Sequence, residues 1–288
     1  MFKGRDYKLL FTVLKNARAN KLNRSLVGFS LQKKIPPLSQ QDLLNFTQAT
    51  KDFNPVYQKD NPPLPPLFIS KLVFPTIKEI ICHKNLKVNL LKLVQAEQKV
   101  TWLQVPRLKD ELELKISLEN IYDTSAGEMI EILAQILSGG KVLVESFFNY
   151  IVRGTKKIVK KKQSQNLIKN KSFQTELITE KNQQLEYALA SGDNNLIHTS
   201  RFFAKISGLS EPIMHGACLV AMGCSSLSRI SLDNDFSKLK SLETRFKSPA
   251  WPGEKLILRG EKKEKEIFFE IKNFVSQKTT LNGNLTLK

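Results

Sequence analysis

Residues 187–223 read YALASGDNNLIHTSRFFAKISGLSEPIMHGACLVAMG, and this segment contains the residues expected to carry the chemistry. It places a carboxylate, Asp193, five positions before an imidazole, His198, within a cluster of Ser, Gly and Asn residues. Five positions on a regular helix would put these side chains on different faces, because helix neighbours lie three and four positions apart. The composition around Ser191 and Gly192 instead favours a tight loop, which can turn both groups toward one point for acid–base chemistry.

The segment after this cluster predicts a buried helix followed by strands. The apolar run from Ile213 to Ile230 is long enough for a central helix and contains several small residues. Alternating or apolar segments bounded by turn residues then predict four strands. They lie within 241–253, 254–263, 265–273 and 280–288.

The first half of the chain presents a similar order of elements. Residues 40–50 have helical spacing, and a turn cluster follows at 51–57. Residues 67–81 are almost continuously apolar and are expected to be buried, with Pro75 kinking or ending a helix there. Between residues 90 and 150, four segments with strand patterns are separated by Asp- and Gly-containing turns.

These two halves look like one unit written twice. The pattern Asp-x-Asn-x-x-Tyr at 52–57 matches Asp-x-Asn-x-x-His at 193–198. Each pattern is followed by a Pro-led apolar helix, and later by a strand and turn of equal length, at 102–110 and 246–254. Because a tyrosine replaces the histidine in the first copy, only the second copy keeps the carboxylate–imidazole pair.

The composition limits the classes of function. With 288 residues and 41% hydrophobic composition, the chain can bury a core as one large domain or two modest ones. It carries 45 basic and 27 acidic residues, for a net charge of +18, partly in a basic connector at 153–171. This connector lacks interleaved aromatics, and no RNA- or DNA-reading motif is found, so we expect no nucleic-acid partner. A solvated linker or attraction for an acidic partner explains the charge better.

Three further expectations concern location and redox state. No stretch is long and apolar enough to predict a membrane span. The apolar run Leu9–Leu14 is short for a secretory signal, so we expect a cytoplasmic protein. The three cysteines, Cys82, Cys218 and Cys224, have no paired spacing, which argues against a disulfide framework and a zinc cage.

The segment Ser191–His198, with Tyr187 upstream and Pro212–Gly216 downstream, resembles the hydratase signature of MaoC-like proteins. These are (R)-specific enoyl-CoA hydratases and 3-hydroxyacyl thioester dehydratases. Leu196 stands where the family has proline, and the strand and turn at 245–254 also look like the family. The resemblance implies an α+β double hot-dog fold: two curved antiparallel sheets, each wrapped around a central helix, joined in one chain.

The resemblance also implies how the halves divide the work. Residues 1–160 would form a degenerate N-terminal half, and residues 161–288 a catalytic C-terminal half. In the catalytic half, Asp193 and His198 would share proton transfer at the water and at C2 of the thioester. The Gly216 backbone N–H, at a helix start, would donate to the thioester oxygen as an oxyanion donor.

The remaining site residues have supporting roles in this interpretation. Asn195 would orient the acyl group or brace the loop, and Tyr187 and Ser191 are expected to be structural supports. His215 is expected to pack or to line the site. The apolar run 67–74 of the first half could form the wall of a tunnel for the acyl chain.

No cofactor and no metal are expected for this chemistry. The expected partner is an acyl-CoA or acyl carrier protein thioester, and the chain would be a monomer or homodimer. Two alternatives remain at this point. One is a hot-dog acyl thioesterase, which does not need the Asp-x-Asn-x-x-His loop, and the other is a catalytically silent acyl-thioester binding module. Retention of both Asp193 and His198 disfavours the silent module, because binding alone does not require that pair.

Overall fold

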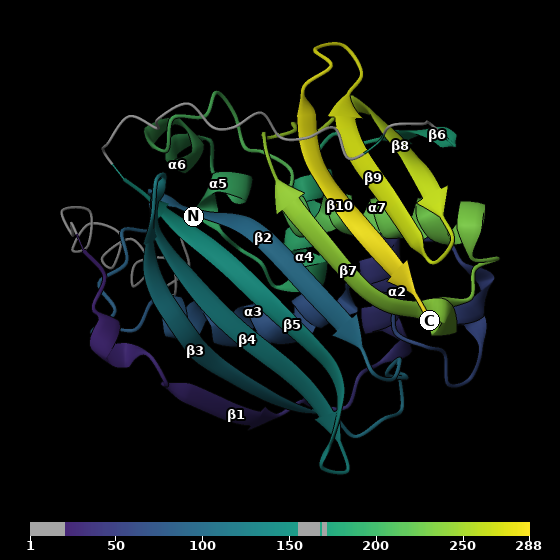
Figure 1. Ribbon diagram of the computed structural model, residues 1–288, viewed down its shortest axis with the longest axis horizontal. Helices are drawn as coiled ribbons and strands as arrows, with labels where there is room; N and C mark the ends of the chain where they lie inside the picture. Colours follow the sequence, from purple (N-terminus) through teal and green to yellow (C-terminus); the bar gives the residue numbers. More distant parts are fainter. Residues whose placement is uncertain (1–20, 155–167, 169–171) are drawn as a thin grey trace.

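A ten-stranded antiparallel sheet dominates the computed structural model, which describes residues 21–154, 168 and 172–288. The strand order across the sheet is β1-β3-β4-β5-β2-β7-β10-β9-β8-β6. The longer helices lie together behind the sheet (Figure 1). The strands are β1 Ser30–Lys34, β2 Leu93–Trp102, β3 Glu113–Thr124, β4 Gly127–Ser138, β5 Lys141–Arg153, β6 Phe173–Ile178, β7 Leu239–Phe246, β8 Lys255–Lys263, β9 Glu266–Asn273 and β10 Thr279–Leu287.

The helices divide between the two halves of the described chain. The first half carries η1 Arg24–Leu26, α2 Gln40–Ala49, η2 Pro55–Gln58 and α3 Phe68–Ile81. The second half carries α4 Gln183–Ser191, α5 Leu196–Thr199, α6 Arg201–Ile206, α7 Gly216–Ser231 and η3 Phe236–Lys238. The helices at 40–49 and 216–231 and the eight strands predicted from the sequence are therefore confirmed.

Each half of the sheet has the same topology. Read from its outer edge, the first half runs β1-β3-β4-β5-β2 and the second runs β6-β8-β9-β10-β7. The halves meet where β2 pairs with β7. At the middle of this pairing, Lys99 lies opposite Glu243, and each stands three residues before the matched pair Trp102 and Phe246. A pseudo-twofold axis therefore passes through this junction, and the double hot-dog fold is confirmed.

The turns matched in the sequence also agree in structure. After β2, the Asp110 carboxylate accepts a hydrogen bond from the Arg107 N–H at 2.8 Å. After β7, the Glu254 carboxylate accepts one from the Trp251 N–H at 2.9 Å. Both turns are thus closed by an acidic side chain that accepts from the backbone N–H three residues earlier. In the sequence, only the equal spacing of the two turns is visible.

Helix α3 narrows one expectation. Pro75 was expected to kink or end a helix, and it does not end one, because α3 continues through it to Ile81. Proline removes one helical N–H and crowds the preceding turn. Burial of the flanking apolar residues, among them Val73, Phe74 and Ile77, offsets that cost. Helix α7 fits its prediction more simply, since residues 217–228 are all buried and it lies at the centre of its half.

Several expectations fall outside the described residues. These are the N-terminal segment at 1–20, most of the basic connector, and the boundary between residues 160 and 161. In the part of the chain that the structure describes, no helix has the length and apolar character required to cross a membrane.

Candidate active site

The loop that carries Asp193 begins where α4 ends. Ser191 is the last residue of α4 rather than part of the loop, which corrects the sequence-based placement. Gly192 follows with φ +76°, the left-handed conformation that glycine adopts without steric cost and that commonly ends a helix. Residues 193–195 then form the loop, and His198 lies on the short helix α5.

Short hydrogen bonds shape this loop. The Ser191 hydroxyl donates to the Tyr187 carbonyl at 2.7 Å and accepts from the Asp193 N–H at 3.2 Å. The Asp193 carboxylate accepts from the Asn195 N–H at 3.2 Å. The Asn195 side chain accepts from the Ile197 N–H at 3.4 Å and so caps α5. This cap uses only the oxygen of the exposed Asn195 side chain, so its bracing and acyl-orienting roles both stay predictions.

His198 is fixed in one tautomer. Its Nδ1 lies 2.8 Å from the Ile213 carbonyl oxygen, which can only accept, so Nδ1 carries a hydrogen. In the neutral ring, Nε2 is then an acceptor and can take a proton. Ile213 was missed as a contributor, and because its backbone makes the contact, no side-chain signal in the apolar run could have identified it.

Asp193 and His198 are brought together as predicted. The candidate ligand atoms of Asp193, His198 and His215 all lie within 4.8 Å of one another. Burial raises the pKa of Asp193, although the neighbouring His198 acts in the opposite direction. Burial also lowers the pKa of His198, opposed by Asp193. Each shift acts toward the neutral form of its group.

His215, expected to pack or to line the site, contacts both Asp193 and His198. Its Nε2 lies 2.9 Å from the Asp193 carbonyl oxygen, and its ring stacks on His198 with centroids 3.8 Å apart. The Tyr187 ring also packs against His215, with centroids 4.9 Å apart. Burial, followed by electrostatic interaction with the neighbouring His198, holds the pKa of His215 well below its usual range. His215 therefore stays neutral and supports both catalytic candidates.

The three residues could also hold a metal ion by geometry. Their ligand atoms are close enough, and carboxylate and imidazole are common ligands. One nitrogen of each histidine, however, is already used by a backbone carbonyl. The absence of a metal requirement therefore stays a prediction.

Gly216 begins α7, so its N–H has no acceptor within the helix. A Cβ at this position would lie 2.5 Å from the Phe246 ring. The absence of a side chain at Gly216 therefore permits close contact between the helix start and β7. The N–H itself is still placed at the positive end of the helix, next to His215.

The first half also borders the site, as expected for its apolar run 67–74, although the individual contacts were not predicted. The Lys71 ammonium on α3 donates to the Ala190 carbonyl at 2.8 Å. A Cβ on Gly192 would lie 3.8 Å from Pro75 of the same helix. Tyr150 on β5 is buried, and its pKa is raised by burial and then by the charge of Asp193. Residues more than 40 positions apart make these contacts, and local patterns carry no information about them.

In the first half, the matching loop is closed. The Tyr57 hydroxyl donates to the Asp52 carboxylate at 2.6 Å, and the Ser225 hydroxyl from α7 donates to its other oxygen at 2.9 Å. Asp52 is 4% exposed. The first copy is predicted to have lost its reactive pair. In the structure, both oxygens of its carboxylate already accept hydrogen bonds from side-chain hydroxyls.

Comparison with known proteins follows the same division of the chain. A family model described as "MaoC like domain" matches residues 162–284, and one described as "FAS1-like, dehydratase domain region" matches residues 25–146. A probable enoyl-CoA hydratase 2 from Dictyostelium discoideum is 26% identical over 207 residues, covering 67% of this chain and 68% of the relative.

Two further comparisons extend this result. The peroxisomal multifunctional enzyme type 2 of Mus musculus is 28% identical over 195 residues, covering 65% of this chain but only 26% of that longer protein. The crystal structure of a MaoC-like dehydratase from Phytophthora capsici superposes with a TM-score of 0.76 at 21% identity, covering 93% of this chain and 98% of that chain. At that identity, the structural match supports the fold alone.

Proposed function

Because this chain joins a MaoC-like domain to a FAS1-like dehydratase region, it belongs to the MaoC-like hydratase and dehydratase family, and we propose that it is a hydro-lyase of fatty-acid metabolism. The proposed reaction adds water to trans-2-enoyl thioesters with (R) stereochemistry, or removes it from (3R)-hydroxyacyl thioesters. The similarity to a probable enoyl-CoA hydratase 2 over about two thirds of both chains supports this choice.

The observation that carries the proposal is the Asp193–His198 pair with His198 held in one tautomer. In hydration, His198 Nε2 takes a proton from water as the oxygen forms its bond to C3. Asp193, whose raised pKa favours the acid form, gives its proton to C2. The products are imidazolium and carboxylate side by side, a pair that attracts. Dehydration runs the same transfers in reverse, and the proton balance is preserved.

The Gly216 N–H completes this proposal as the oxyanion donor. Negative charge develops on the thioester oxygen when C3 is attacked, and an unpaired N–H at a helix start stabilises it. His215 and Asn195 would keep the loop and the helix start aligned through the contacts described above. Tyr187 and Ser191 act in the same way, through packing and the loop hydrogen bond.

The test is hydration of crotonyl-CoA by the purified chain. The rate is measured from the loss of enoyl absorbance, and the chirality of the product is then determined. An acyl carrier protein ester of the same acid, run in parallel, distinguishes the two carriers. Formation of the (3R)-hydroxy product on either carrier supports the proposal. Hydrolysis to free thiol without hydration would instead favour a thioesterase, and binding without turnover would favour a silent module.

Location and assembly belong to the same proposal at a finer level. We place the protein in the cytoplasm as a monomer or homodimer, with the first half supplying contacts that single hot-dog units obtain by pairing. Imaging of the tagged chain tests the location. Light scattering of the purified chain tests the assembly state, and a larger oligomer would contradict it.

A further inference from the structure

A row of buried side chains on β5 faces α3 and extends away from the proposed site. Tyr150, Phe148, Ser146 and Val144 occupy alternate positions of β5, and all four are buried. Alternate residues of a strand share one face, so these side chains form a single row under the helix. Tyr150 is at the end of the row near Asp193.

An aromatic pair stands next in this row. Phe148 packs edge-on against Phe74 of α3, with ring centroids 6.0 Å apart and planes at 63°. Phe74 immediately precedes Pro75, the residue that borders Gly192 of the catalytic loop. The pair therefore lies between α3 and the sheet, next to Tyr150 in the β5 row and on the side away from the catalytic loop.

Beyond the pair, the side chains become small. Ser146 follows on β5, and Ser70 lies one helical turn before Phe74 on α3, on the same face. The Ser70 hydroxyl is buried and has no hydrogen-bond partner among the described residues. A buried hydroxyl without a partner is costly, so Ser70 is a polar position in this otherwise apolar space that its hydrogen bonding does not explain.

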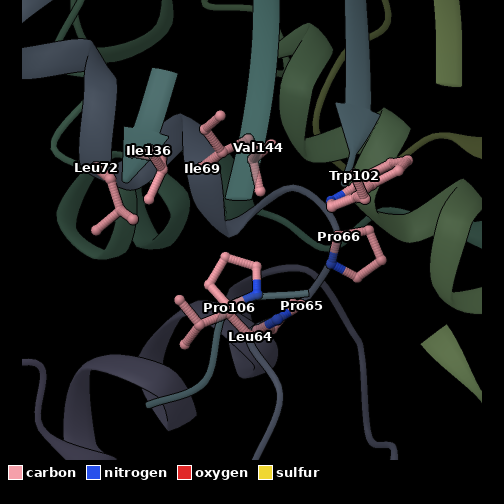
Figure 2. A pocket seen from close by; sticks show the side chains of 9 residues that line it. All are labelled: Leu64, Pro65, Pro66, Ile69, Leu72, Trp102, Pro106, Ile136 and Val144. Atoms are coloured by element: carbon pink, nitrogen blue, oxygen red, sulfur yellow. The ribbon is translucent and has the colours of Figure 1, made fainter. Parts of the chain in front are cut away.

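The row ends at a small apolar cavity (Figure 2). Figure 2 shows Ile69, Leu72, Ile136 and Val144 on one side of it, opposite Pro65 and Pro106. Val144 belongs to the β5 row, and Ile69 and Leu72 belong to the first turns of α3. The cavity and the catalytic loop are thus at opposite ends of one apolar row.

We propose that the Phe74–Phe148 pair is the chain-length stop of the acyl site. This inference rests on the hydratase function proposed above. At about 3.3 Å per strand residue, the pair lies about 7 Å along β5 from Tyr150, and the cavity about 20 Å. A short acyl chain ends before the pair, whereas a long chain must displace it to reach the small residues and the cavity beyond.

The test compares the Phe148→Leu variant with the wild-type chain on trans-2-enoyl-CoA esters from crotonyl to hexadecenoyl. The measured quantity is the ratio of kcat/KM for hexadecenoyl-CoA to that for crotonyl-CoA. We expect this ratio to rise at least about tenfold, the factor that burial of about two more methylene groups supplies. Phe74→Leu tests the other ring of the pair and should move the ratio in the same direction.

Phe269→Leu is the matched control. Phe269 is fully buried in β9 of the second half, away from the β5 row. A purely structural effect of Phe-to-Leu truncation would lower the rates for all chain lengths alike in this control and in the two variants. An unchanged ratio in both Phe148→Leu and Phe74→Leu, or an equal rise in Phe269→Leu, would overturn the chain-length stop.

A wild-type chain that hydrates crotonyl-CoA but not longer esters supports the stop before any mutation is made. Equal turnover of crotonyl-CoA and hexadecenoyl-CoA by the wild-type chain would refute it while leaving the hydratase proposal intact. Failure to hydrate every ester would instead refute the proposed function on which the stop depends.

Discussion

The loops at 52–57 and 193–198 have closely similar backbones but treat their carboxylates differently. Asn54 has φ −65° and ψ 124°, and Asn195 has φ −61° and ψ 127°. Each asparagine caps a short helix by accepting from the N–H two residues later, at 3.0 Å and 3.4 Å. The duplicated scaffold therefore survives in both copies, and the scaffold alone does not determine function.

The difference lies in what faces each carboxylate. Asp52 accepts from Tyr57 of its own loop and from Ser225 of the other half. Asp193 accepts from the Asn195 N–H, and no side chain of the described residues donates to it. A carboxylate satisfied by two hydroxyls is a structural element, whereas one left open beside an imidazole is available for proton transfer.

Replacement of the two aspartates should give the largest contrast. Asp193→Asn removes the proposed acid and should lower kcat about 10²- to 10⁴-fold, the usual contribution of general acid–base catalysis. Asp52→Asn, the matched control, should keep kcat per folded molecule while lowering the melting temperature. Enoyl-CoA hydration with both proteins measures this, and a wild-type rate for Asp193→Asn would refute the role of the pair.

Exchange of the loop-ending residues sharpens the comparison. His198→Tyr gives the second loop the Asp-x-Asn-x-x-Tyr pattern of the first. We expect kcat to fall at least about 10²-fold, because the proposed base is removed. Adding Tyr57→His should not restore turnover, because Ser225 still occupies Asp52. Recovery of hydration in this double variant would show that the first loop is open to substrate, contrary to its observed hydrogen bonding.

The dependence of kcat/KM on pH should reflect the ionisation of Asp193 and His198 in the second loop and not that of the first loop. Hydration needs unprotonated His198 and protonated Asp193, so kcat/KM should fall about tenfold per pH unit as His198 gains a proton on the acid side. On the alkaline side it should fall similarly as Asp193 loses its proton. Burial lowers the pKa of His198 and raises that of Asp193, so both shifts increase the fraction of molecules in this competent form. Because the two groups interact, the apparent pKa values of the two limbs belong to the pair and not to either residue.

Tyr57→Phe provides the control for this profile. Its removal of a hydroxyl affects only the first loop, so both limbs should keep their wild-type positions. A displaced limb in Tyr57→Phe would mean that the Asp52 cluster is electrostatically coupled to the active pair.

Sequence patterns predicted the elements because those depend on local chemistry. Periodicity located the strands and α7, and the loop composition correctly brought Asp193 and His198 together. Local reasoning was less precise where tertiary burial matters. The sequence left open whether Pro75 kinks or ends a helix, and α3 continues through it among buried neighbours. The contact of Gly216 with the Phe246 ring joins residues far apart in the sequence, so no local pattern shows it.

Contacts between the halves could not be predicted from the sequence. Ser225 meets Asp52 from 173 positions away, and Lys71 reaches the Ala190 carbonyl from 119 positions away. Neither residue belongs to a motif, and the pseudo-twofold junction that brings them together exists only after the sheet has formed. The carbonyl of Ile213 is hidden for a different reason, since a backbone group leaves no trace in residue type.

Removal of Ser225 should change stability without changing chemistry. Ser225→Ala leaves one oxygen of the buried Asp52 without its donor, which should lower the free energy of unfolding by about 1–3 kcal/mol. Ser228→Ala on the same helix is the control, because its buried hydroxyl has no partner among the described residues and its loss should be close to neutral. Urea unfolding of both variants measures the difference, and equal stabilities would show that the Ser225 hydrogen bond contributes little.

The smallest effect concerns Leu196, the second-loop residue that stands where the first loop has Pro55. Both positions are the first residue of a short helix, where proline's missing N–H is not needed. Asn195 already has the extended conformation that a following proline requires, as Asn54 does. Leu196→Pro should therefore be more stable than Leu196→Ala by about 0.4–1 kcal/mol, because proline restricts the unfolded chain.

Leu196→Ala accounts for the lost side-chain packing, and kcat should be retained in both variants. A Leu196→Pro variant less stable than Leu196→Ala in urea unfolding would show that the two loop backbones differ in a way that their dihedral angles do not reveal.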